Sequence, residues 1–202
     1  MLILASQSPT RKALLAGAGL RFEVHAPQTD ERAVEAAALK GGADARQIAQ
    51  LLAEAKARAI VGVRPEAVII AADQTLALGY ELLHKPQSFE AAVDQLNQLR
   101  GKTHRLHAAV TVAVDGAIVW SHVETAELTM RDFTDAERDE VLSLEGGAVL
   151  ASVGGYRLEG PSIRLFEAIR GDYFTILGLP LLPLLSALRQ FAPETFTPAA
   201  AP

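Results

Sequence analysis

The spacing of apolar residues along the chain separates segments of two kinds. Uninterrupted apolar runs at residues 2–5 and 67–72 are typical of strands that are covered on both faces. Residues 103–114 and 117–131 instead alternate between apolar and polar positions, and the Asp-Gly pair between them predicts a two-residue hairpin turn. The pattern therefore predicts two buried strands and one long antiparallel pair.

Apolar residues at helical spacing predict helices that begin near residues 10, 44, 89, 135 and 181. Ser8, Ser88 and Thr134 precede three of them and are typical N-cap residues. We interpret residues 21–43 as irregular, and the glycine-rich residues 152–178 follow no clear period. Strands and helices in this order predict an α/β fold with a mixed, twisted sheet flanked by helices.

Length and composition indicate one globular domain. The chain has 202 residues, of which 50% are hydrophobic and 21% charged, and this is long enough for a sizeable core. We place the domain at residues 1–191. The proline- and alanine-containing tail at 192–202 is expected to be disordered.

Charge and hydropathy exclude several classes of partner. Nineteen Lys and Arg against 24 Asp and Glu leave a net charge of −5, so no overall positive field attracts nucleic acid. No apolar run approaches the ~18–20 residues that span a bilayer, and the N-terminus lacks the features of a signal peptide. The absence of cysteine excludes disulfides and thiolate metal sites. We expect a cytoplasmic protein with neither a membrane nor a nucleic-acid partner.

The segment between the first strand and the first helix is a candidate phosphate site. A helix N-terminus presents free N–H groups to an anion. Ser6, Ser8 and Arg11 add hydroxyl and guanidinium donors at the same place. An ordinary helix cap followed by an exposed arginine remains the alternative.

Asp73 is a candidate for acid–base or metal chemistry. It follows the apolar run at 67–72, and the carboxyl ends of strands are where open α/β sheets bind ligands. A carboxylate there can hold a divalent cation or activate water; a turn residue is the alternative. Lys85, before a proline, suits phosphate but is weak evidence alone. The five histidines lack metal-ligand spacing, so we assign them structural roles.

Short motifs follow one another along nearly the whole chain. The first is Leu-Ile-Leu-Ala-Ser-Gln-Ser-Pro-Thr-Arg-Lys-Ala-Leu-Leu at 2–15. The others are Asp30-Glu31, Lys56-Ala57, Ala72-Asp73-Gln74-Thr75, Lys85-Pro86, Gly101-Lys102-Thr103-His104, Glu159-Gly160, Gly171-Asp172-Tyr173 and Gly178-Leu179-Pro180-Leu181. Taken together over residues 2–189 and in this order, they resemble the motifs of the Maf family of nucleoside triphosphate pyrophosphatases.

The resemblance implies hydrolysis of a nucleoside triphosphate to the monophosphate and pyrophosphate with a divalent cation, Mg²⁺ or Mn²⁺. It also implies an elongated, two-lobed fold with a central cleft, like that of inosine triphosphate pyrophosphatases, and a homodimer.

Residue by residue, the resemblance assigns roles to seven side chains. Asp73 takes the place of the general base, and Glu31 and Lys56 line the cleft with it as catalytic residues. Asp73 and Glu31 are also the implied metal ligands. The implied substrate-binding residues are Ser8, Arg11, Lys85 and Glu159.

Glu159 stands where the family often has glutamine, and with Asp73-Gln74 and Leu165-Phe166-Glu167 it resembles the branch that acts on 7-methyl-GTP. The branch that acts on dTTP and UTP is the alternative, as is an enzyme for deaminated purine triphosphates. A nucleotide-binding regulator of cell division with weak hydrolysis is a further alternative from another class. Thr10 and His84 depart from the family's usual arginine and glycine.

Overall fold

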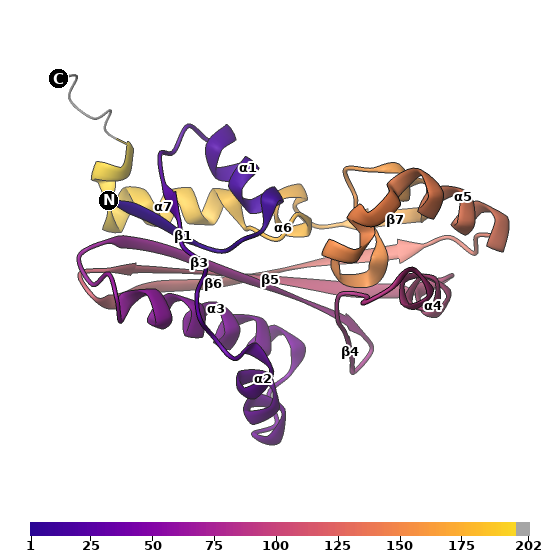
Figure 1. Ribbon diagram of the computed structural model, residues 1–202, viewed down its shortest axis with the longest axis horizontal. Coiled ribbons are helices and arrows are strands. Elements are labelled where there is room, and N and C mark those ends of the chain that lie inside the picture. Colours follow the sequence, from indigo (N-terminus) through magenta and orange to yellow (C-terminus); the bar gives the residue numbers. More distant parts are fainter. Residues whose placement is uncertain (197–202) are drawn as a thin grey trace.

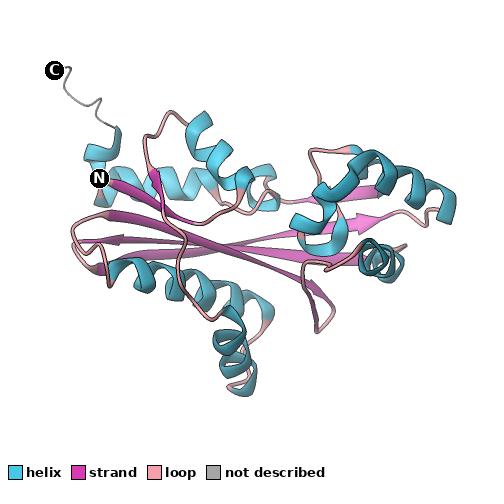
Figure 2. Cartoon of the chain, viewed as in Figure 1, coloured by secondary structure: helices cyan, strands magenta, loops and turns pink. Residues whose placement is uncertain are grey.

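A twisted sheet runs the length of an elongated molecule and carries helices on both faces (Figures 1 and 2). The computed structural model describes residues 1–196. Within these residues the sheet contains seven strands, β1 (Leu2–Ala5), β2 (Glu23–Val24), β3 (Val68–Leu78), β4 (Glu81–Leu83), β5 (Thr103–Val114), β6 (Ala117–Met130) and β7 (Phe166–Arg170).

The strand order makes the sheet mixed, as the sequence predicts. The strands follow the order β2-β1-β3-β5-β6-β7, and β4 pairs with β3 beside this path. β1 is parallel to β2 and to β3, whereas β3, β5, β6 and β7 pair antiparallel. The α/β fold with a mixed sheet is therefore confirmed.

The helices lie on the two faces of this sheet. In Figure 1, α1, α6 and α7 cover one face at the N-terminal end, and α2 and α3 lie across the opposite face. The helices within residues 1–196 are α1 (Pro9–Gly17), α2 (Glu31–Lys40), α3 (Ala45–Val61), α4 (Phe89–Leu99), α5 (Asp135–Glu145), α6 (Tyr173–Ile176) and α7 (Leu181–Phe191). None of them is both long and apolar enough to cross a membrane.

The two longest strands of the sheet, β5 and β6, form a hairpin. Its turn residues Asp115 and Gly116 have φ angles of 49° and 78°. Positive φ at both positions defines the turn that matches the right-handed twist of the strands. Thr103 pairs with Thr129 at the far end, so the hairpin spans both ends of the molecule.

The two largest apolar cores of residues 1–196 lie in the two lobes of the molecule. One core lies between the sheet and helices α1 and α7, and it includes Leu4, Leu15, Ile70 and Leu184. The other lies beneath α4, α5 and the loop after α5, and its largest fully buried side chain is that of Phe133. Because β3, β5 and β6 contribute to both cores, the lobes share one sheet.

Two expectations about irregular segments are wrong. Residues 31–40 form α2, because Asp30 caps the helix by accepting a hydrogen bond from the Ala33 backbone N–H at 3.0 Å. Disorder is expected from residue 192 onwards, but residues 192–196 are ordered. Ala192 is fully buried, and Pro193–Phe196 forms a short 3-10 helix. Residues 197–202 of the expected tail lie outside the described residues.

His104 is a structural histidine of the second core, as the sequence analysis assigned it. The residue is 1% exposed, and its Nε2 lies 2.7 Å from the hydroxyl of Tyr156. Burial lowers the pKa of His104 from 6.5 to about 4, because the charged imidazolium is poorly solvated there.

This burial predicts a pH-dependent stability. Between pH 6.5 and pH 4 the unfolded chain binds a proton at His104 and the folded chain does not, so the free energy of unfolding falls as the pH drops. We expect His104 to account for a loss of about 2 kcal/mol between pH 7 and pH 5, measured by urea unfolding. His104→Gln, which still reaches Tyr156, should lose correspondingly less. An equal loss in both proteins would contradict the assignment.

Candidate active site

A gap in one edge of β3 defines the candidate site. On this edge β1 pairs with residues 68–71 of β3, and β4 pairs with residues 76–78. Residues 72–75 between them have no strand partner on this edge within the described chain, which leaves a gap of about 13 Å. We call this stretch the notch. It lies where the two lobes meet, at the point where strand order changes.

Three charged side chains meet at the notch. The ammonium Nζ of Lys56 lies 3.0 Å from Oδ2 of Asp73 and 2.9 Å from Oε1 of Glu31. The side chains of Lys56 and Asp73 are 10% and 12% exposed, and that of Glu31 is 54% exposed. Lys56 therefore joins a buried carboxylate to one that reaches solvent.

Local structure explains how these residues come together. Successive strand residues point to opposite faces, so Asp73 points towards α3 together with Ile69 and Ala71. The small residues Ala53 and Ala57 let α3 lie close on the sheet, and Lys56 of the same helix turns its ammonium to Asp73. Glu31 is the first residue of α2, which packs against α3.

Asp73 is held firmly at this position. Its Oδ1 accepts a hydrogen bond from the backbone N–H of Gln74 at 2.7 Å. Its Oδ2 is buried and accepts no hydrogen bond of normal geometry within residues 1–196, so its contact is the ion pair with Lys56. Oδ2 of Asp73 can therefore still accept a hydrogen bond or coordinate a cation.

Ser8 and Arg11 occupy the end of the notch formed by β1 and α1. Ser8 caps α1 by accepting a hydrogen bond from the Arg11 backbone N–H at 3.3 Å. The Arg11 guanidinium points inward and is almost entirely buried. Burial lowers the pKa of Arg11, and the nearby charges of Asp73 and Glu31 oppose this shift.

The structure places Lys85 and Glu159 apart from this charged group. Lys85 is exposed just beyond β4, on the other side of the notch from β1. Glu159 lies in the loop after α5, where its Oε1 is 3.4 Å from Nε of Arg157. No hydrogen bond or ion pair within residues 1–196 joins either residue to Asp73, Lys56 or Glu31.

Gln74 is a functional candidate that sequence reasoning did not single out. Its Nε2 donates to the carbonyl oxygens of Thr175 and Ile176 at 3.1 and 3.0 Å, which ties α6 to the notch. Thr175 in turn donates from its hydroxyl to Glu124 at 2.9 Å. The signal in the sequence was the polar Gln74 directly after Asp73, but its partners are about 100 residues away.

Asp73 and Glu31 suit a small divalent cation such as Mg²⁺ or Mn²⁺. Both offer the hard carboxylate oxygens that these ions prefer, and Oδ2 of Asp73 has spare capacity. Within residues 1–196 no three His, Asp or Glu side chains form a complete metal site. Two carboxylates fit a cation whose remaining ligands are water and substrate phosphates, as is usual for Mg²⁺.

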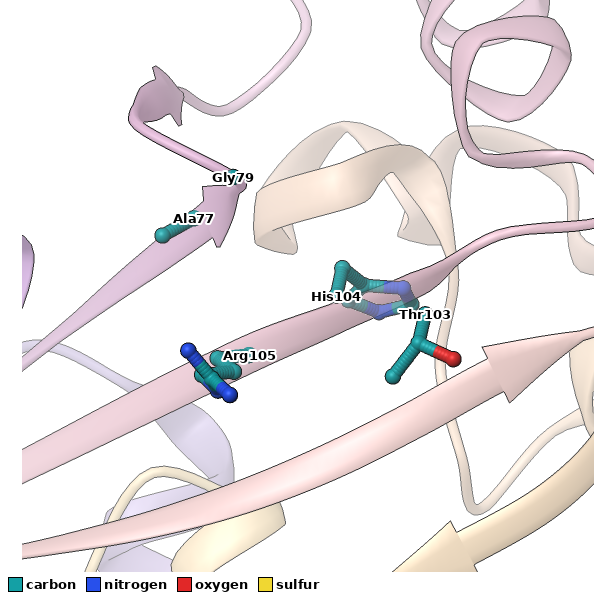
Figure 3. Close-up of a pocket in the computed structure, with 5 residues that line it drawn as sticks. All are labelled: Ala77, Gly79, Thr103, His104 and Arg105. Carbon is teal, nitrogen blue, oxygen red and sulfur yellow. The ribbon is translucent and has the colours of Figure 1, made fainter.

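A small cavity of about 190 Å³ lies elsewhere, near the end of β3 (Figure 3). It is lined by Ala77, Gly79, Thr103, His104 and Arg105. None of the seven predicted site residues lines it. We place the site at the notch, because Lys56 brings two carboxylates together there and one of them, Asp73, is buried.

Fold and site together define an α/β protein whose notch combines a helix N-terminus, buried cations and carboxylates. This combination suits a ligand that carries phosphate groups. The chain belongs to the Maf family: the family model described as Maf-like protein matches residues 1–191. The resemblance drawn from the sequence motifs is confirmed.

Curated relatives match nearly the whole chain. A 7-methyl-GTP pyrophosphatase of Brucella abortus is 51% identical over 189 residues, which are 94% of this chain and 95% of the relative. A nucleoside triphosphate pyrophosphatase of Bradyrhizobium diazoefficiens is 51% identical over 189 residues, 94% and 93% of the two chains. A solved structure of a nucleoside-triphosphatase (dITP/XTP pyrophosphatase) of Mycobacterium abscessus is 16% identical in sequence. The match covers 98% of this chain and 97% of that protein's chain, and its TM-score is 0.43.

The ion pairs of Lys56 predict an asymmetric effect on stability. Lys56→Met removes the partner of a buried carboxylate, so we expect the free energy of unfolding to fall by about 3 kcal/mol. Glu31→Gln affects an exposed partner and should cost less than about 1 kcal/mol. Urea denaturation at pH 7 measures both.

The matched control for Lys56→Met removes both charges. Lys56→Met combined with Asp73→Asn leaves no buried carboxylate without its partner, because Glu31 is exposed, so this double variant should be more stable than Lys56→Met alone. A double variant less stable than Lys56→Met would contradict the interpretation.

Proposed function

We propose that the protein is a nucleoside triphosphate pyrophosphatase, which hydrolyses the triphosphate to the monophosphate and pyrophosphate. The observation that carries the proposal is the buried Asp73 carboxylate, paired with Lys56 at the notch. Relatives with this activity in their names share about half of the sequence over 94% of the chain. As part of the same proposal, the enzyme works in the cytoplasm, as composition and hydropathy led us to expect, and as a homodimer, as the family resemblance implies.

Asp73 acts as the general base in this proposal. The oxygen of a water molecule forms a bond to the α-phosphorus, and its proton passes to the Asp73 carboxylate. The bond between the α-phosphorus and the oxygen that bridges to the β-phosphorus breaks, and pyrophosphate leaves with that oxygen. Burial and the backbone N–H of Gln74 keep the carboxylate in one orientation, which the proton transfer requires.

Positive groups around the notch stabilise the charge on the phosphates. Lys56 lies beside Asp73, and Ser8 and the N-terminus of α1 face the same opening. Lys85 is an exposed residue just beyond β4, apart from this group, and in this proposal it binds the distal phosphates of the substrate. A bound Mg²⁺ or Mn²⁺, held by Asp73 and Glu31, would neutralise further charge on the phosphate oxygens.

We further propose 7-methyl-GTP as the preferred substrate. This choice is supported by the name of the Brucella abortus relative and by Glu159 at the position where the family often has glutamine. A carboxylate accepts hydrogen bonds from a guanine edge and favours a base that carries a positive charge, as 7-methylguanine does. The side chain of Glu159 is 29% exposed and so is accessible to a ligand.

Asp73→Asn tests the mechanism. The amide cannot accept the proton from water, so we expect turnover to fall by at least about 100-fold. Pyrophosphate release with Mg²⁺ or Mn²⁺ measures this, and circular dichroism checks that the variant is folded. Near wild-type turnover would remove Asp73 from the role of base.

A substrate panel tests the choice of base. Pyrophosphate release should be fastest with 7-methyl-GTP among 7-methyl-GTP, GTP, dTTP, UTP and ITP. Glu159→Gln should reduce the preference for 7-methyl-GTP over GTP by about tenfold, because one charged contact is lost. Preference for dTTP and UTP in the wild-type protein would assign it to the other branch.

A further inference from the structure

The guanidinium of Arg11 is occupied by other parts of the protein. Its Nε donates to the carbonyl oxygen of Gly178 at 2.8 Å. Its Nη1 donates to the carbonyl oxygen of Ala72 at 2.9 Å and to the hydroxyl of Ser6 at 3.1 Å. The residue is only 9% exposed. A guanidinium has five N–H donors. The three bonds use Nε and Nη1, and both nitrogens point into the protein.

The three acceptors belong to segments that are distant in the sequence. Ser6 lies between β1 and α1, Ala72 in the notch of β3, and Gly178 between α6 and α7. The bonds to Ala72 and Gly178 span 61 and 167 residues of the chain. A planar fork of donors holds acceptors in fixed directions, which a lysine ammonium does not do.

Gly178 fits closely over Arg11. Its φ is 92°, and a Cβ built on it would lie 3.4 Å from both Nη2 of Arg11 and Oε1 of Gln74. Gln74 holds the carbonyls of Thr175 and Ile176 in the same turn. We call this set, in which Arg11 and Gln74 hold residues 175–178, the turn clamp.

We infer that Arg11 is a positioning residue: as part of the turn clamp it holds residues 175–178 against the notch, and it does not bind the substrate phosphates. Its hydrogen bond to Ala72, next to Asp73, fixes the stretch of β3 that lacks a strand partner on the notch edge and carries the carboxylate. The nearby charges of Asp73 and Glu31 act on Arg11 without an ion pair to it, whereas Lys56 is ion-paired with both carboxylates. The phosphates are left to Lys85, Lys56 and the N-terminus of α1.

The kinetic test rests on the proposed function and uses variants that keep the charge. Arg11→Lys retains a cation but not the three directed bonds, and Gly178→Ala crowds the clamp while leaving Arg11 in place. For both we expect kcat to fall by at least about tenfold, with the KM for the triphosphate and the Kd for pyrophosphate changed less than about threefold.

Lys85→Gln is the matched control, because Lys85 is the exposed candidate for a phosphate contact. It should weaken pyrophosphate binding by about tenfold, measured by isothermal titration calorimetry. Arg11→Lys with wild-type kcat would overturn the inference. So would a loss of pyrophosphate affinity in Arg11→Lys that equals the loss in Lys85→Gln.

Hydrogen exchange tests the clamp without reference to activity. The amides of Leu177, Gly178 and Leu179 donate to Tyr173, Thr175 and Phe174 within the turn. We expect their exchange to speed up by at least about tenfold in Arg11→Lys, while amides in β5 keep wild-type rates. Unchanged exchange in the turn would overturn the inference. A wild-type protein that hydrolyses no triphosphate would refute the proposed function alone, since exchange still decides the role of Arg11.

Discussion

Lys56 places its ammonium beside a carboxylate that would be costly to bury without a partner. Asp73 is almost entirely buried, and its Oδ2 has the Lys56 Nζ at 3.0 Å as its contact. An uncompensated buried charge is strongly destabilising, and the ammonium of Lys56 compensates this one. The same ammonium draws Glu31 and the start of α2 towards β3. The buried carboxylate of the candidate site and the local packing of two helices therefore depend on one lysine.

The sheet determines where this group meets its ligand. β1 leaves β3 after residue 71, and β4 joins β3 only at residue 76, so the edge between them is open. A shorter gap would be closed by strand pairing, and a longer one would leave many backbone groups unpaired. Each lobe supplies one side of the opening, and the shared strands β3 and β5 hold the two sides at a fixed separation.

Two polar side chains connect the opening to the C-terminal part of the chain. Arg11 and Gln74 hold the turn at residues 175–178 over the notch, and Gly178 permits this close approach. The hydroxyl of Thr175 in this turn donates a hydrogen bond to Glu124 of β6. The site thus depends on segments from both ends of the chain, which explains why the family motifs extend over nearly its whole length.

The sequence by itself determined the elements that depend on neighbouring residues and the identity of the family. The hairpin at residues 115 and 116, the caps Ser8 and Thr134 and the mixed sheet follow from local preferences and apolar spacing. Local preferences did not predict α2. Glycines and a proline flank this short helix, and Ala38 is its one buried residue. Only the tertiary structure decided that Lys56 bridges Asp73 and Glu31, that Arg11 turns inward and that Lys85 and Glu159 stay apart from them. Lys56 and Asp73 are 17 positions apart, and Arg11 and Gly178 are 167 apart. Contacts over such separations depend on how strands and helices pack, which local sequence preferences do not specify.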